Sequence, residues 1–163
     1  MWPRPMRESF PRVCAVRIEF DDKIKTGIPE VDAQHEVLIE IYNDLDAALQ
    51  KGKANRQMSE ILAKLYQYAK THFEDEEKLL ADHAYPDLAQ HQFEHKRLVE
   101  KLKGFVIRYT RANERISVQV VEFTRAWVHG HIMNADMAYV EHVKSRMGPA
   151  NETVSAPDVE DGA

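Results

Sequence analysis

The chain has 163 residues, a formal net charge of −5 at pH 7, 44% hydrophobic residues and 30% charged residues, which is typical of one globular domain. The acidic balance argues against a nucleic-acid partner, because phosphate binding favours a basic surface, and no apolar run is long enough to span a bilayer. A single cysteine, Cys14, excludes an internal disulfide and fits a reducing compartment, so we expect a cytoplasmic protein with no membrane partner.

The two ends of the chain differ in composition from its middle. Residues 1–17 contain prolines among scattered charges without periodicity, and we expect a flexible or extended leader. Within the segment 13–20 an extended piece is possible, although a lone strand would have no partner. The acidic, polar composition of residues 148–163 predicts a disordered tail. Residues 18–147 are predicted to form the domain.

Four segments of the domain have apolar residues at helical spacing, and they are expected at about residues 29–51, 54–82, 87–110 and 116–147. Pro29 and Pro86 stand where helices begin, because proline is tolerated in the first turn. Gly52 and Gly148 stand where helices end. Four helices with short connections predict an all-α fold, an antiparallel up-down-up-down four-helix bundle with an N-terminal extended arm.

Five of the eight histidines are distributed over all four predicted helices. The pairs HxxxE at residues 72–76 and HxxxH at 91–95 each present two side chains in one direction, because residues four apart share a helix face. These positions are in phase with apolar core positions such as Leu65 and Leu98, where unpaired polar groups would be costly. A metal site inside the bundle would satisfy them. The predicted ligands are His35, His72, Glu76, His91, His95, His131 and Asp136.

The remaining histidines illustrate the alternative interpretation, since a lone helical histidine is more often a surface group or a hydrogen-bonded core residue. We interpret His83, His129 and His142 in that way. The spacing between His131 and Asp136 is also unusual, because residues five apart point about 140° apart on a regular helix. Either the two side chains reach around the helix or a π-bulge redirects them, and we favour the bulge.

The number of predicted ligands indicates more than one ion, because a first-row ion takes at most six donors. Five imidazoles and two bridging carboxylates, together with a shared oxo or hydroxo group, would fill all but one position of two octahedral ions. The open position suggests a binding site for a small diatomic molecule. These donors do not by themselves distinguish iron from manganese.

Four stretches of the sequence resemble the hemerythrin family, specifically its single-domain bacteriohemerythrins. They are GIPEVDAQH at 27–35, HFEDEEKLL at 72–80, YPDLAQHQFEH at 85–95 and WVHGHIMNAD at 127–136. The resemblance extends over about residues 17–146. It implies two non-haem iron ions (Fe2+/Fe3+) with an oxo or hydroxo bridge that bind dioxygen reversibly.

The resemblance also implies that the two ions are held unequally. One iron, coordinatively filled, is held by the three histidines of the third and fourth helices, and the iron with the open position is held by His35 and His72. Both carboxylates bridge the pair. Val128 stands where the family commonly has leucine lining the dioxygen pocket, and this smaller side chain predicts faster autoxidation. Phe20 replaces a common tryptophan, and the leader with Cys14 has no counterpart in the typical short form.

The function implied by the resemblance is dioxygen carriage, storage or delivery by a monomer that is not an enzyme, with a client oxygen-using enzyme as a possible partner. A di-iron enzyme or sensor that handles peroxide or nitric oxide is the alternative, because it would use the same open position. Iron buffering is the third interpretation.

Overall fold

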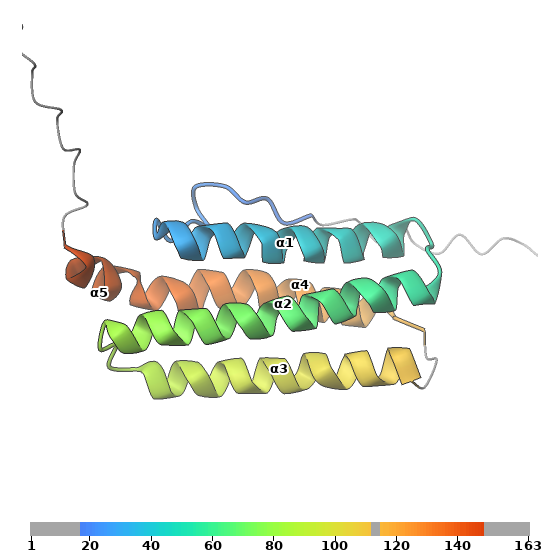
Figure 1. Ribbon diagram of the computed structural model, residues 1–163. Helices are drawn as coiled ribbons and strands as arrows, with labels where there is room; N and C mark the ends of the chain where they lie inside the picture. The colour runs from blue at the N-terminus through green and yellow to red at the C-terminus, as the bar shows by residue number, and fades with distance from the viewer. Residues whose placement is uncertain (1–16, 112–114, 149–163) are drawn as a thin grey trace, which may run out of the picture.

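The computed structural model describes residues 17–111 and 115–148, and these residues form helices joined by short connections. The elements are α1 (Pro29–Gln50), α2 (Asn55–Asp82), α3 (Leu88–Arg111), α4 (Val118–Gly130), the π-helix η1 (His131–Asp136) and α5 (Met137–Met147). Figure 1 shows successive helices running in opposite directions, with α4 continuing through η1 into α5. The predicted antiparallel four-helix bundle is confirmed. The expectations for most of the leader, including Cys14, and for the tail beyond Gly148 concern residues outside the described ranges.

The helix ends follow the local sequence. Pro29 is the first residue of α1, and the Asp32 carboxylate accepts hydrogen bonds from the backbone N–H of Thr26 and Gly27 at 2.7 and 2.9 Å, which fixes the turn before the helix. Gly52 and Gly148 have φ values of 59° and 74°, the left-handed region that glycine adopts without strain. The predicted ends of the first and fourth helices are therefore confirmed.

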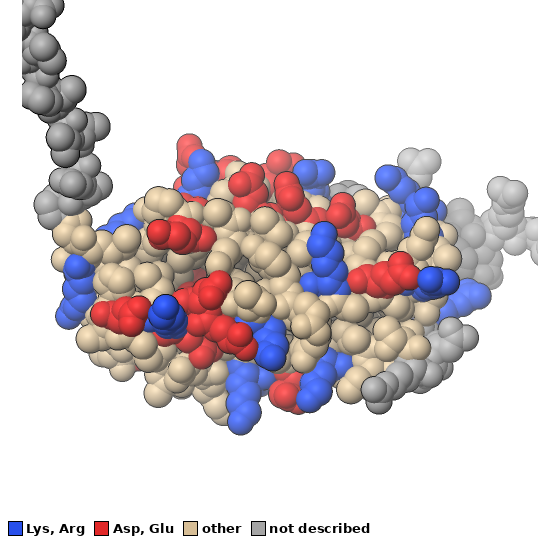
Figure 2. Space-filling view, in the orientation of Figure 1, with Lys and Arg blue, Asp and Glu red and all other residues tan. Residues whose placement is uncertain are grey.

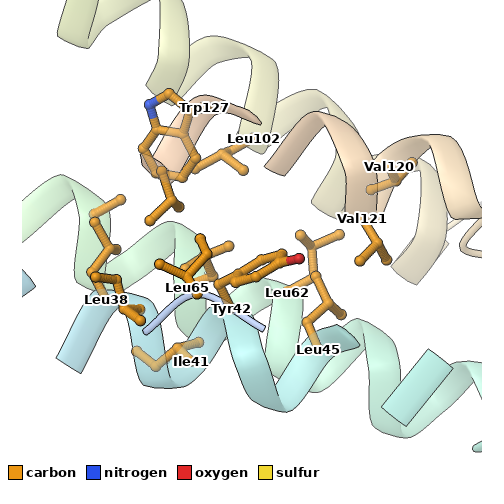
Figure 3. Close-up of a cluster of buried hydrophobic side chains, with 14 of the residues drawn as sticks. Leu38, Ile41, Tyr42, Leu45, Leu62, Leu65, Leu102, Val120, Val121 and Trp127 are labelled. Atoms are coloured by element: carbon orange, nitrogen blue, oxygen red, sulfur yellow. The ribbon is translucent and has the colours of Figure 1, made fainter. Parts of the chain in front are cut away.

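The apolar core fills the half of the bundle that lies toward the α1–α2 connection. Figure 3 shows side chains from all four helices pointing toward one another, among them Leu45, Leu62 and Leu102, which are completely buried. Phe93 belongs to the apolar pattern of the third predicted helix, yet it is 56% exposed. Its ring lies under the guanidinium group of Arg97 at 5.9 Å, so a neighbouring cation covers it instead of the core.

The described part of the N-terminal arm, residues 17–20, is extended and lies against α1. The backbone N–H of Ile18 donates to Asn43 Oδ1 at 2.9 Å, and the Ile18 carbonyl accepts from Asn43 Nδ2 at 3.0 Å. One side-chain amide thus supplies the donor and the acceptor that a second strand would provide. The predicted leader, residues 1–17, lies almost entirely outside the described residues, so its bounds stay a prediction. Among the described helices none is long and apolar enough to cross a membrane.

Candidate metal centre

The π-helix η1 explains the five-residue spacing in the fourth helix. Hydrogen bonds of a π-helix connect residues five apart, so His131 and Asp136 lie one turn apart on the same face. Their Nε2 and Oδ1 atoms are 3.1 Å apart, and both side chains are buried. The predicted π-bulge is confirmed, and it brings both residues into the bundle interior.

The structure brings all seven predicted side chains into two overlapping groups. The first group is Glu76, His91, His95, His131 and Asp136, and the second is His35, His72, Glu76 and Asp136. Within each group, one donor atom of every residue lies within 4.8 Å of the others. Glu76 and Asp136 belong to both groups, which places the two carboxylates between three histidines on one side and two on the other. His83, His129 and His142 belong to neither group.

In the three-histidine group His91 Nε2 lies within hydrogen-bond distance of Glu76 Oε1, at 2.6 Å, but the donor atoms on the two-histidine side do not satisfy one another. His35 Nε2 lies 3.1 Å from Asp136 Oδ2, and His72 Nε2 lies 3.1 Å from Glu76 Oε2. None of these four atoms has a hydrogen-bond partner among the described residues, although all are buried, because the directions of approach miss the required angles. Buried polar atoms without partners are costly, so this arrangement suits a cation that lies between the donors. The residues present therefore fit a metal pair.

Two of the histidines are oriented by partners outside the groups. His72 Nδ1–H donates to Gln34 Oε1 at 2.8 Å, and His95 Nδ1–H donates to Glu77 Oε1 at 2.8 Å. Because both acceptors are oxygens, the proton resides on Nδ1 and the Nε2 lone pair faces the interior, as metal ligation requires. Gln34 also donates to Asp75 at 2.9 Å. Figure 2 shows acidic side chains gathered over the C-terminal half of α2, which carries this aspartate.

The sequence analysis did not identify Gln34 or Glu77. Both stand beside a predicted ligand, in the pairs Gln34-His35 and Glu76-Glu77, and adjacent residues point in different directions on a helix. Each of them therefore serves a histidine of a neighbouring helix. The double glutamate of HFEDEE is the one signal in the sequence for the second of them.

The electrostatics of the groups favour the charge states of metal ligands. Burial lowers the pKa of His95 to about 2, so this imidazole is neutral at physiological pH. Burial alone would raise the pKa of Asp136, but the adjacent His131 and His35 outweigh it and hold that pKa well below its usual range. Burial and the neighbouring Asp136 oppose ionisation of Glu76 as well, but the nearby His72 and His91 outweigh them and lower its pKa. Neutral imidazoles and ionised carboxylates are the forms that bind metal ions.

Aromatic and aliphatic side chains enclose the groups on the side facing the apolar core. The Phe73 ring stacks on the imidazole of His95 with centroids 3.8 Å apart and an interplanar angle of 8°. Trp127 approaches Phe73 edge-on, and Val128 is completely buried in the same apolar cluster. These contacts exclude water from this side of the centre.

Comparison with known proteins gives a consistent result. A family model described as the Hemerythrin HHE cation binding domain matches residues 26–143. Bacteriohemerythrin of Pseudomonas aeruginosa (strain LESB58) is 30% identical over 128 residues, which covers 78% of this chain and 82% of the relative. Bacteriohemerythrin of Clostridium acetobutylicum is 30% identical over 125 residues, covering 74% of this chain and 96% of the relative. A solved wild-type hemerythrin superposes with a TM-score of 0.66 at 25% identity, covering 72% of this chain and 90% of that structure.

Proposed function

This chain belongs to the hemerythrin family, and on that premise we propose that its seven buried side chains hold two non-haem iron ions and bind dioxygen reversibly. The proposal includes dioxygen carriage, storage or delivery rather than catalysis. The observation that carries it is the sharing of Glu76 and Asp136 between a group with three histidines and a group with two. Two carboxylates in common suit a bridged pair of ions, and the unequal histidines suit one ion with an open position.

Each side chain has a role in this proposal. His91, His95 and His131 would hold one ion, His35 and His72 would hold the other, and Glu76 and Asp136 would be shared between them, together with an oxo or hydroxo group. When bound, the ions supply the two electrons and the open position that reversible dioxygen binding requires. The use of imidazoles in place of further carboxylates keeps the negative charge low, which favours binding over oxidation of substrates.

The surrounding residues keep the open position dry and the ligands in place. His35 is completely buried and His72 is 2% exposed, so the two-histidine side has almost no contact with solvent. Gln34 fixes the orientation of His72 through the 2.8 Å hydrogen bond to Nδ1. Bound dioxygen is lost as a reduced product when protons reach it, and water delivers those protons. Exclusion of water from this side therefore slows that loss.

Metal analysis combined with optical spectra under repeated cycles of air and argon tests the proposal. We expect about two irons per chain and an oxygenated spectrum that appears and disappears reversibly. His72→Ala is expected to lose iron and the oxygenated spectrum, whereas His129→Ala, which removes an exposed histidine outside both groups, is the matched control. Rapid irreversible oxidation with turnover of peroxide or nitric oxide would contradict the proposal in favour of an enzyme. Full iron and normal oxygen binding in His72→Ala would contradict the ligand assignment.

A further inference from the structure

A groove of about 840 Å³ lies between α3 and the continuous helix formed by α4, η1 and α5. On the second of these sides half of the lining residues are small, namely Ala126, Gly130, Ala135 and Ala138. Small side chains do not reach across to α3, so the seam between the helices remains open. His91 and His131 line the same groove, which therefore extends from the surface to the three-histidine group.

The centre comes nearest to solvent at this groove. The side chains of His91 and His131 are 5% and 6% exposed, whereas those of His35 and Asp136 are completely buried. The end of the centre toward α5 is closed by an apolar cluster that includes Ile28, in which every buried member is at most 3% exposed. A hydrophilic species that enters through the groove would therefore have to push aside fewer side chains than one that enters from any other side of the centre.

The groove is lined with donors that suit a divalent cation. Asp87 and Glu94 contribute carboxylates, and Gln90 and Asn134 contribute amide groups. The Glu94 side chain is half-buried and accepts a solvent-exposed hydrogen bond from Gln90 Nε2 at 3.2 Å. Oxygen donors along a path replace the water molecules of a hydrated ion one at a time, so the ion is never buried without partners.

The two cations of the groove are drawn toward aromatic rings. The Arg97 guanidinium group lies 5.9 Å from the centroid of the Phe93 ring, and Lys101 Nζ lies 5.5 Å from that of Phe123. Along the chain Asp87 and Glu94 stand within about one helical turn of His91, whereas Arg97 and Lys101 stand six and ten residues from it. The carboxylates are therefore the charges of the groove nearest to His91 along α3.

We propose that this groove is the path by which a ferrous ion enters and leaves the centre. The proposal rests on the proposed function, because it requires that the seven side chains hold iron. The ion passes Glu94, reaches His91 and His131 at the floor of the groove, and from there reaches the two carboxylates. No electron transfer or covalent step is involved.

Substitutions along an entry path and substitutions of a metal-ligating residue have different effects on the exchange of iron. Obstruction of the path slows entry and exit by the same factor, so both rates change while the equilibrium affinity for the ion does not. A change in a ligand alters the affinity itself. The rate of iron loss from the loaded protein, compared with its iron content at equilibrium, distinguishes the two.

The test fills the groove with a larger side chain. Ala138→Phe places a ring in the seam from an exposed position of α5, and Ala33→Phe, at an exposed position of α1 that does not line the groove, is the matched control. Iron transfer from the loaded full-length protein to a ferrous chelator is followed optically. We expect Ala138→Phe to release iron about tenfold more slowly, with unchanged iron content and spectrum, and Ala33→Phe to behave as the parent.

A second pair of variants tests the charge in the groove. Glu94→Gln is expected to slow uptake of ferrous ion about threefold at low salt and to weaken its dependence on ionic strength. Glu100→Gln removes an exposed carboxylate of the same helix that lies 3.8 Å from Lys103 and serves as the control. Ala126→Phe, at another groove position, replaces Ala138→Phe if circular dichroism shows that the latter does not fold.

The outcomes separate the two proposals. Two irons per chain and an unchanged release rate in the filled variants would overturn the path and leave the proposed function standing. Failure of the parent protein to retain iron at all would overturn the proposed function and the path with it. A parallel change of release rate and equilibrium iron content would identify the filled position as part of the binding site instead of a path.

Discussion

The two halves of the bundle interior are built from the same helices but are held together in different ways. Toward the α1–α2 connection, Leu45, Leu62 and Leu65 are completely buried among other apolar side chains, and their burial stabilises the fold directly. Toward the α2–α3 connection, His35 and Asp136 are just as deeply buried, and their polar atoms have no hydrogen-bond partners among the described residues. The first half is stabilised by apolar packing alone, whereas the second half contains buried polar atoms that a bound cation could satisfy.

Removal of metal is expected to produce the largest effect, and to act on the polar half alone. Metal present at a thousandfold excess over its dissociation constant stabilises the folded state by about 4 kcal/mol, which chelation would remove. Amide hydrogen exchange with and without a chelator measures where protection is lost. We expect the loss around His35 and η1, with protection retained around Leu62. Equal loss in both halves would show that they are not independent.

Truncation in the apolar half is expected to have the next largest effect and the opposite selectivity. Leu62→Ala leaves a cavity at a completely buried position and should reduce the free energy of unfolding by about 3 kcal/mol, as measured with denaturant. Iron content and the oxygenated spectrum should be unchanged. The control Val37→Ala, at a residue that is 36% exposed, should change stability by less than about 0.5 kcal/mol. Loss of iron in the Leu62 variant would mean that the apolar half also positions the ligands.

Acidification is expected to destabilise the polar half of the interior, which contains the buried His95. The pKa of His95 is about 2 in the fold because of burial, and about 6.5 in the unfolded chain, so the unfolded state binds more protons between these values. Stability is therefore lost as the pH falls below about 6.5, by about 2 kcal/mol at pH 5. Denaturant unfolding of the chelated protein at several pH values measures this loss. His95→Gln should flatten the dependence, and an unchanged slope would contradict the assignment to His95.

Substitution at the boundary between the halves is expected to have the smallest effect. Val128→Leu enlarges a completely buried side chain of the apolar cluster where the family commonly has leucine. We expect autoxidation of the oxygenated protein to slow about threefold, because the larger side chain excludes water from the side of the centre that faces the apolar cluster. Val121→Leu, at a residue buried at the far end of the same cluster, is the control. Equal or faster autoxidation in Val128→Leu would reject the predicted role of this position.

The sequence predicts the helices and the convergence of the seven side chains because both follow from helical periodicity. His72 and Leu65 point inward for the same geometric reason, so the phase of the apolar residues also locates the polar ones. The outer partner Glu77 is out of phase with them, and its contact with His95 depends on how closely α2 and α3 approach. The exposure of Phe93 and the open seam beside α3 likewise depend on distances between helices, which a single sequence does not encode.

The π-helix has a consequence for how this chain tolerates deletions. The segment from His131 to Asp136 holds one residue more than the same turns of an α-helix would need. Deletion of Asn134 would restore regular α-helical hydrogen bonding and leave His131 and the aspartate four positions apart, so both side chains would stay on one face. Tyr139 and Val143, which are completely buried, would keep their inward direction, whereas the same deletion in a regular α-helix would rotate every later residue by about 100° around the helix axis. The π-helix therefore absorbs one additional residue without changing which side chains of α5 face the bundle interior.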